Sequence, residues 1–294
     1  MHEQSIIPKP LDRITHPICL IVCYFGKRPL ELQFFLASCA SNPTINFLIF
    51  SDCISPDEAP ANVTVIPSTL KDIEELATQK LGLDIALNEP YKLCDFKPAY
   101  GEIFSEFLQG YSFWGMTDLD VIFGNIRSFI SDALLTNYDV INAHDKYIVG
   151  HFSLYRNTPK FTSLFRKSRD YKNVFQHPKT VSFTECGKEW KSFSRRQTQP
   201  ESESKLDSMT HVINRLSSAG AVRKHFQLLV REKPQLHKTN WLLQWDNGRL
   251  IDINEMCEIM YFHFHLFKDS TTFKTPDWSS TPATFYMNSH GFFE

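Results

Sequence analysis

FWGMTDLDVIFGN, residues 113–125, is the stretch that decides how this chain folds. An apolar run ends in Asp118 and Asp120, and a second apolar run follows at once. Acidic residues at the end of a buried strand are typical of the edge at which open α/β sheets bind ligands. Side chains two residues apart point to the same side of an extended chain, so both carboxylates can face one hard cation. The stretch therefore favours an enzyme that handles phosphates through a divalent metal.

Strands and helices alternate on the N-terminal side of this stretch. Residues 18–25, 45–52 and 62–67 are apolar runs of strand length, whereas 30–41 and 70–81 have the apolar spacing of helices. Parallel strands that are buried on both faces read as continuous apolar runs of this kind. The order predicts an α/β fold with a Rossmann-like, mostly parallel sheet and helices on both faces.

The same pattern continues through the middle of the chain. A helix is predicted over 98–108, followed by the strand that delivers the acidic pair. Residues 126–135 again have helical character, and 138–143 and 148–156 have strand character. A further helix is predicted over 206–217. These elements extend one α/β sheet.

Two late segments carry strand signals. The tripeptide 246–248, Asp-Asn-Gly, lies between apolar runs and predicts a tight hairpin. MYFHFHLFKD, residues 260–269, alternates as a strand does and places His263 and His265 on one side.

Composition excludes several classes of protein. With 294 residues, 42% of them hydrophobic and 14% aromatic, the chain has ample material for a core, and whole-chain disorder is excluded. A net charge of −2 argues against a dedicated nucleic-acid binder. The seven cysteines include no CxxC pair and read as reduced, buried residues. No apolar run approaches the roughly 20 residues of a membrane span, so we expect a cytoplasmic protein, soluble or peripheral at the inner face of the plasma membrane.

The domain organisation expected from these patterns is simple. Residues 1–17 predict a flexible leader, 18–268 one domain, and 269–294 a C-terminal tail. Within the domain, 157–205 predicts a basic, partly flexible insertion. Residues 156–196 hold eleven Lys or Arg and three acidic residues. Two interpretations stay open for this basic region: a solvated insertion, or a surface that faces an anionic membrane or a phosphate-bearing acceptor.

Four phrases in order carry a resemblance to a known family. They are YKLCDFKPAYGEIF at 91–104, FWGMTDLDVIFGNI at 113–126, WDNGRL at 245–250 and YFHFHLFK at 261–268. Over residues 18–268 the chain resembles GT-A-type glycosyltransferases of bacterial capsule and lipopolysaccharide biosynthesis, which contain a DxD motif. The resemblance implies a GT-A-like fold and a sugar-transfer reaction.

The resemblance also implies a donor site. In that family the DxD pair, here Asp118 and Asp120, binds Mn²⁺ or Mg²⁺ at the diphosphate of the sugar donor. The first strand end and the acid after the second strand hold the base and ribose of the nucleotide. The matching positions here are Tyr24, Phe25, Gly26 and Asp52.

Further residues take their expected roles from the same family. A late histidine completes the metal site, either His263 or His265, of which we favour His263. Lys268 contacts phosphate, and Lys97 is a second candidate, although a surface charge remains an equal alternative. Asp207 is the candidate base for an inverting reaction, against a helix-capping role. Positive charge at a departing diphosphate is also what the chemistry requires, since negative charge develops there.

The expected function is hexosyl transfer from a nucleoside diphosphate donor, a UDP-sugar, to a saccharide or lipid-linked saccharide acceptor, with no nucleic acid involved. Two alternatives are open. An apolar strand followed by DxD also fits a haloacid-dehalogenase-like phosphohydrolase, with Asp118 as nucleophile and Asp120 as acid. The other alternative is a non-catalytic nucleotide-sugar-binding protein, in which the two acids only close a strand.

Overall fold

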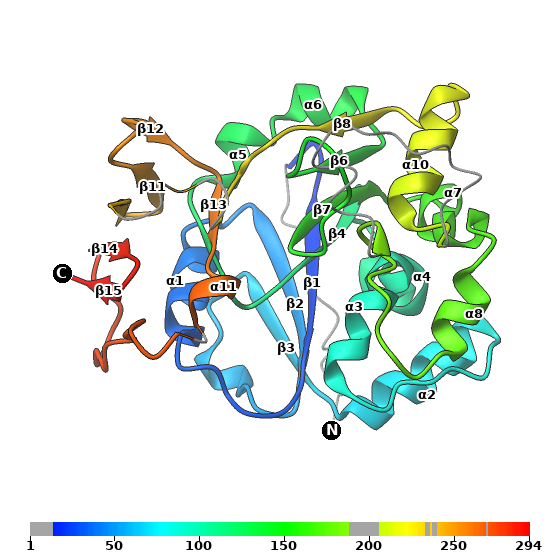
Figure 1. Ribbon diagram of the computed structural model, residues 1–294, viewed down its shortest axis with the longest axis horizontal. Helices are drawn as coiled ribbons and strands as arrows, with labels where there is room; N and C mark the ends of the chain where they lie inside the picture. Colours follow the sequence, from blue (N-terminus) through cyan, green and yellow to red (C-terminus); the bar gives the residue numbers. More distant parts are fainter. Residues whose placement is uncertain (1–13, 188–205, 233–235, 237–239, 269) are drawn as a thin grey trace.

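A computed structural model describes residues 14–187, 206–232, 236, 240–268 and 270–294. They form a single mixed α/β domain around a seven-stranded sheet with the order β3-β2-β1-β4-β7-β6-β8 (Figure 1). Strand pairs β1–β2, β2–β3, β1–β4 and β6–β8 are parallel, and β7 is antiparallel to both of its neighbours. The expected mostly parallel sheet is therefore confirmed. The strands are β1 (Ile18–Tyr24), β2 (Ile45–Ser51), β3 (Val63–Pro67), β4 (Phe113–Thr117), β6 (Val140–Asn142), β7 (Phe152–Arg156) and β8 (Lys224–Phe226).

Helices cover both faces of this sheet. Alternate side chains of β1 point to opposite faces: Ile18 and Leu20 pack with α1, α5 and α6, whereas Cys19 and Ile21 pack with α2, α3 and α4. The helices α7, α8 and α10 pack on the second of these faces. The bounds are α1 (Leu32–Ala40), α2 (Leu70–Leu81), α3 (Leu93–Phe96), α4 (Tyr100–Ile103), α5 (Ile126–Phe129), α6 (Asp132–Asn137), α7 (Pro159–Thr162), α8 (Tyr171–Gln176) and α10 (Met209–Ser218).

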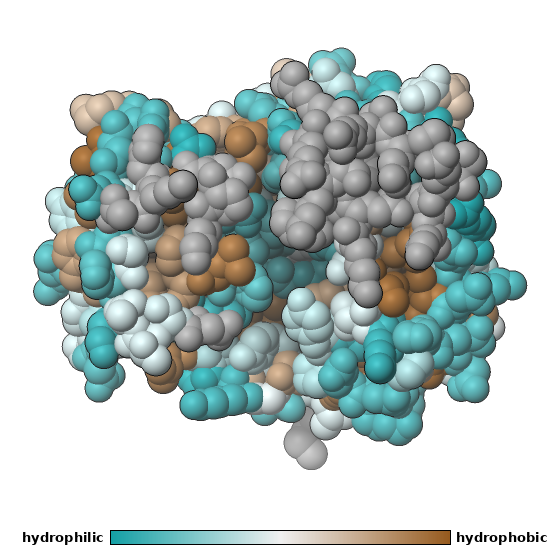
Figure 2. Space-filling view, viewed as in Figure 1, coloured by the Kyte–Doolittle hydropathy of each residue, from teal (hydrophilic) through white to brown (hydrophobic). Residues whose placement is uncertain are grey.

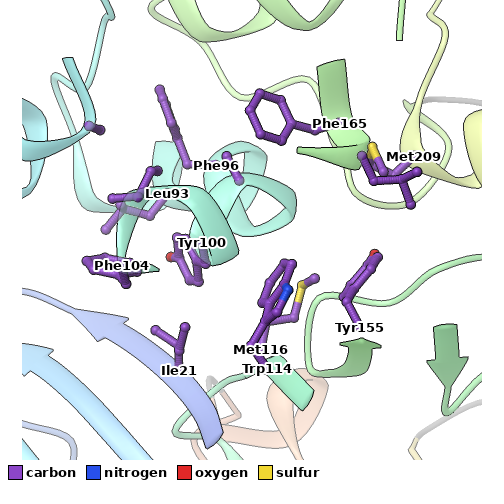
Figure 3. Packing of buried hydrophobic residues seen from close by; sticks show 14 of the residues in the cluster. Ile21, Leu93, Phe96, Tyr100, Phe104, Trp114, Met116, Tyr155, Phe165 and Met209 are labelled. Carbon is purple, nitrogen blue, oxygen red and sulfur yellow. The ribbon is translucent and has the colours of Figure 1, made fainter. Parts of the chain in front are cut away.

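Close packing of α4 on β4 fixes the strand that ends in the acidic pair. Figure 3 shows Tyr100 between Phe104 and Trp114 of β4, with Tyr155 of β7 on the far side of Trp114. The rings of Trp114 and Tyr155 stack with centroids 4.7 Å apart. A Cβ atom at Gly101 would lie 2.4 Å from the indole, so only glycine permits this approach.

Two smaller sheets flank the main one. In the first, β13 lies between β5, to which it is antiparallel, and β9, to which it is parallel. The second is antiparallel and has the order β12-β11-β10-β14-β15. Its β10–β11 hairpin confirms the turn expected at 246–248, where Asn247 and Gly248 both have positive φ. The strands are β5 (Val121–Phe123), β9 (Val230–Arg231), β10 (Leu243–Asp246), β11 (Arg249–Asp252), β12 (Cys257–Glu258), β13 (Tyr261–His263), β14 (Thr284–Asn288) and β15 (Gly291–Phe293).

Several segments differ from the sequence expectation. The helix expected over 98–108 is instead a series of short helical turns over 97–99, 100–103 and 105–108. The strand expected over 260–269 ends at His263, and α11 (His265–Lys268) follows it. In the expected tail, β14 and β15 complete the second sheet. The 3₁₀ turns are η1 (Pro56–Glu58), η2 (Pro90–Lys92), η3 (Lys97–Ala99), η4 (Ser105–Leu108) and η5 (Leu164–Lys167).

The basic region and the cysteines can be placed in this fold. Residues 159–176 of the basic region form α7, η5 and α8, and residues 188–205 lie outside the described part of the chain, as does most of the expected leader. All seven cysteines are free thiols, as expected, but only Cys19, Cys39 and Cys186 are buried; the prediction of burial was wrong for the other four, which are half-buried. None of the helices in the described residues has the length and apolar composition that a membrane crossing requires.

Candidate functional site

The acidic pair lies where the chain leaves the main sheet. β4 ends at Thr117, and the backbone bends at Asp120 before β5 pairs with β13, where Val121 lies opposite His263. Figure 2 shows that this face of the molecule is hollowed between α11 and α3. Because the backbone bends here, Asp118 and Asp120 are not two residues of one extended strand. Their carboxylates contact different partners.

Asp120 is surrounded by positively charged and hydrogen-bonding side chains. Its carboxylate lies 2.7 Å from Lys268 Nζ, 3.5 Å from His263 Nε2 and 3.4 Å from His265 Nδ1. The backbone N–H of Phe264 donates to its carbonyl at 3.1 Å. Burial alone would raise the pKa of Asp120, but hydrogen bonds from the two histidines and the charge of Lys268 hold that pKa well below its usual range. Asp120 is therefore ionised at neutral pH.

His263 is held between two carboxylates. Its Nε2 faces Asp120, and its Nδ1 lies 3.1 Å from Oε2 of Glu232. Burial lowers the pKa of His263, but the hydrogen bonds to both carboxylates outweigh burial and raise that pKa to about 9. The ring of His151 stacks on it with centroids 4.2 Å apart. Without a metal, His263 is accordingly an imidazolium at neutral pH.

Lys97 and Asp118 form a second ion pair beside this cluster. Lys97 lies in η3, is buried, and donates to Asp118 and to the carbonyl of Gly150 at 3.1 Å. Burial alone would lower the pKa of Lys97, but the charge of Asp118 keeps it above its usual value. Glu185 is close as well, since a Cβ atom at Gly150 would lie 3.2 Å from Lys97 Nζ and 3.4 Å from Glu185 Oε1. Burial raises the pKa of Glu185 to about 7, against the opposing charge of Lys97.

The end of β1 lies near the same cluster. The backbone N–H of Gly26, at φ +108°, donates to Asp52 Oδ1 at 2.9 Å, which links the ends of β1 and β2. Phe25 is buried in the core, and the Tyr24 hydroxyl donates to a carbonyl in the next turn at 2.8 Å. Burial raises the pKa of Tyr24, with further effects from Cys53, Lys268 and Asp120. The ends of β1, β2 and β4 thus come together at one edge of the sheet.

The donor atoms of this cluster fit a divalent metal. One ligand atom from each of Asp120, His263 and His265 lies within 4.8 Å of the others, and a second group of this kind consists of His151, Glu232 and His263. Carboxylate oxygen with imidazole nitrogen suits Mn²⁺, and oxygen donors also suit Mg²⁺. Asp118, which accepts from Lys97, belongs to neither group, and its predicted role as a metal ligand stays a prediction.

Comparison with known proteins places this chain in a family. The model described as "Family of unknown function (DUF6625)" matches residues 20–294. The chain belongs to this family. No curated protein matches it.

Solved structures similar to this family member are glycosyltransferases, the class that the sequence resembles. The galactosyltransferase LgtC with donor and acceptor sugar analogues is 11% identical, has a TM-score of 0.37, and aligns over 71% of this chain and 86% of its own. Mouse xyloside xylosyltransferase 1 is 12% identical, with a TM-score of 0.35 over 55% of this chain and 72% of its own. The bifunctional glycosyltransferase WbbM is 11% identical, with a TM-score of 0.34 over 52% and 35%. Identity and TM-score are too low for these structures to support a conclusion about activity.

Asp207 lies just before α10, as the sequence predicted for a residue near a helix start. Ser208 is the N-cap residue, and the Asp207 carboxylate accepts from Arg215 at 2.9 Å and from the backbone N–H of Arg169 at 2.9 Å. Burial opposes ionisation, but the contacts with Arg215 and Arg169 lower the pKa of Asp207. These contacts give the carboxylate a structural role, and its role as a base stays a prediction.

Sequence reasoning missed two residues near the candidate site: Glu185 and Glu232. Neither belongs to a local motif. Glu232 meets His263 only because β9 pairs in parallel with β13, and Glu185 is brought near Lys97 by tertiary packing alone. No local signal in the sequence could have found such contacts.

Proposed function

We propose that this family member is a metal-dependent glycosyltransferase that moves a sugar from a nucleoside diphosphate donor, a UDP-sugar, to a saccharide acceptor in bacterial surface-polysaccharide synthesis. The observation that carries the proposal is the cluster of Asp120, His263, His265 and Lys268 at the carboxyl end of the central strand β4. A carboxylate, two imidazoles and an ammonium group converge there. This combination suits a metal-diphosphate group, because it offers metal ligands and a cation for phosphate at one place.

The side chains would divide the work as follows. When bound, the divalent ion would supply positive charge to the diphosphate of the donor. Asp120 and His263 would hold that ion, with His265 as a third ligand. Lys268 is paired with Asp120 in this structure. When the Asp120 carboxylate holds the ion, the ammonium group of Lys268 would be available for the phosphate oxygens. Lys97 lies at the same edge of the sheet but is buried, so we assign it to the orientation of Asp118.

The nucleotide would bind at the end of β1. Tyr24, Phe25 and Gly26 precede the turn, and Asp52 fixes that turn by accepting from the Gly26 N–H. We propose that Tyr24 packs on the base and that Asp52 lies on the ribose side. The charges of Asp120 and Lys268 both affect the pKa of Tyr24, and such effects weaken with distance. The end of β1 must therefore lie near the Asp120 cluster, which supports this arrangement.

The acceptor side of the site is proposed on sequence grounds. Asp207 is our candidate base for an inverting reaction, and Glu185 offers a carboxylate closer to Lys97 with a pKa of about 7. A lipid-linked saccharide would bring the acceptor to the inner face of the plasma membrane, where the basic region could contact anionic lipid.

The phosphohydrolase alternative is less well supported. It requires Asp120 to carry a proton as the general acid. The pKa of Asp120 is held well below its usual range by His263, His265 and Lys268, so this carboxyl group is ionised. An ionised carboxylate can bind metal but has no proton to give.

Substitution of the metal-binding residues tests the proposal. Asp120→Asn should nearly abolish sugar-nucleotide turnover in the presence of Mn²⁺, because one ligand charge is lost while no core residue changes. His263→Ala should weaken the dependence on Mn²⁺ more than His265→Ala does, because His263 is buried and held on both sides whereas His265 is 42% exposed. Full activity of Asp120→Asn would remove this residue from the site, and the reverse order of the histidines would move the ligand to His265.

A further inference from the structure

Glu232 and His263 are brought together by strand pairing. β9 runs parallel to β13 with Val230 opposite Tyr261 and Arg231 opposite Phe262. Glu232 directly follows β9 and His263 is the last residue of β13, so this register brings the two side chains close to each other. Their contact, Nδ1 to Oε2, is 3.1 Å long, and both side chains are largely shielded from water.

The chemistry of the two groups decides which one donates the hydrogen bond. A carboxylate in this setting only accepts hydrogen bonds, so Nδ1 of His263 must carry the proton that it donates to Glu232. A neutral imidazole has one N–H, and the other nitrogen then presents its lone pair. That other nitrogen is Nε2, which faces Asp120 at 3.5 Å. A metal ligand needs such a lone pair on the side of the metal.

The ring of His263 is also fixed in orientation. His151 stacks on it at 4.2 Å, and His151 Nδ1 is itself 2.7 Å from the hydroxyl of Tyr261, two residues before His263. His265 is held less firmly: its ring stacks on His263 at 5.7 Å, its ion-pair partner among the described residues is Asp120, and its side chain is 42% exposed. The two histidines therefore differ in how firmly the protein orients them.

We propose that Glu232 is a positioning residue, which accepts the Nδ1–H of His263 and so presents Nε2 of that ring to the metal. The inference rests on the proposed metal site and adds to it a residue that acts through His263 without touching the ion. Carboxylates behind a ligating histidine set its tautomer and raise its basicity, and their loss commonly weakens metal binding about 10- to 100-fold.

The test is a titration of the metal-free protein with Mn²⁺ in which EPR measures the concentration of unbound Mn²⁺ at each step. This gives the affinity and the stoichiometry of metal binding without any substrate. We expect one Mn²⁺ per chain. Glu232→Ala should weaken binding about 10- to 100-fold, whereas Glu232→Gln should weaken it less, because its amide oxygen still accepts from Nδ1. Glu258→Gln, which changes a carboxylate paired with Arg249 in the second sheet, is the matched control and should leave the affinity unchanged.

A double variant separates positioning from direct ligation. If Glu232 acts through His263, Glu232→Gln should have no further effect on Mn²⁺ affinity in a His263→Ala background. An effect that persists in that background would overturn the inference, as would two Mn²⁺ per chain with one lost in Glu232→Ala, because Glu232 would then be a ligand. Unchanged affinity in folded Glu232→Ala and Glu232→Gln proteins would overturn it too.

The outcomes also distinguish this inference from the proposed function. If wild type binds no Mn²⁺, both are wrong. If Mn²⁺ binds and depends on Glu232, but no sugar nucleotide responds, the positioning role stands and the glycosyltransferase proposal fails.

Discussion

The affinity of the protein for Mn²⁺ should rise steeply with pH, and His263 is the reason. Its pKa is raised to about 9 by hydrogen bonds to Asp120 and Glu232, which outweigh the opposing effect of burial. A metal that binds His263 must replace the proton on Nε2. Proton and metal therefore compete for the same nitrogen throughout the neutral range.

The magnitude follows from that pKa. With a pKa of about 9, about 1% of His263 is unprotonated at pH 7 and about 10% at pH 8, so the apparent Kd for Mn²⁺ should fall about tenfold over this interval. The same pKa has a consequence for stability of the metal-free protein. The value is raised above the 6.5 of an unperturbed histidine, so the stabilisation is fully present below pH 6.5 and is lost as the pH rises through 9. A pKa difference of about 2.5 corresponds to about 3 kcal/mol.

The assay is the Mn²⁺ titration repeated under argon at half-unit steps from pH 6.5 to 8, with His265→Ala as the comparison. Wild type and His265→Ala should show the same steep dependence, since His263 is intact in both. The reasoning is refuted if the affinity of wild type levels off above pH 7, as it would for a histidine with an ordinary pKa.

Three further predictions concern the residues that hold the site in place. Asp118→Asn should lower the free energy of unfolding by about 3 kcal/mol, and Lys97→Met by less, because the first change removes the ion-pair partner of a buried ammonium group whereas the second leaves a carboxylate that is 35% exposed. Urea denaturation measures both, and the reverse order would contradict this account. Asp207→Asn should lower the melting temperature, because it breaks the ion pair with Arg215 of α10. A role of Asp207 as the base would require, in addition, a loss of kcat of more than about 100-fold. Gly101→Ala should cost about 1–3 kcal/mol, because the added methyl group collides with Trp114; an unchanged melting temperature would show that α4 can move away from β4.

The main sheet could be predicted from the sequence because its strands are buried on both faces. Continuous apolar runs such as 18–25 and 45–52 become β1 and β2 within a residue of the expected ends, and the helix over 70–81 is reproduced in full. That helix has both a capping box at Thr69 and a left-handed glycine at Gly82, which are local signals. Such local signals can be recognised in the sequence, so the ends of this helix could be predicted.

Elements fixed by distant contacts could not be predicted. The alternation of residues 260–269 is that of a strand, but β5 offers only three residues for pairing, and the chain turns into α11 after His263. Both histidines still reach Asp120, one from the strand and one from the helical turn. Residues 284–288 have weak strand signals on their own and form β14 by pairing with β10.

The candidate site divides in the same way. Asp120, His263 and Lys268 could be singled out because each lies in a short, chemically distinctive phrase. Their supports, Glu232 and His151, lie directly after β9 and directly before β7, and their contacts with His263 depend on a register that the sequence does not display. The sequence therefore indicates the central residues of the site but not the residues that hold them in place.

The measurement that tests the central claim most directly is a thermal-shift and hydrolysis screen of UDP-, GDP-, CMP- and dTDP-sugars, each with and without Mn²⁺. We expect one nucleotide, UDP, to stabilise the protein only when Mn²⁺ is present, with slow metal-dependent release of UDP from its sugar. The glycosyltransferase account would be contradicted if no nucleotide raised the melting temperature while a simple phosphate ester was turned over with Mg²⁺.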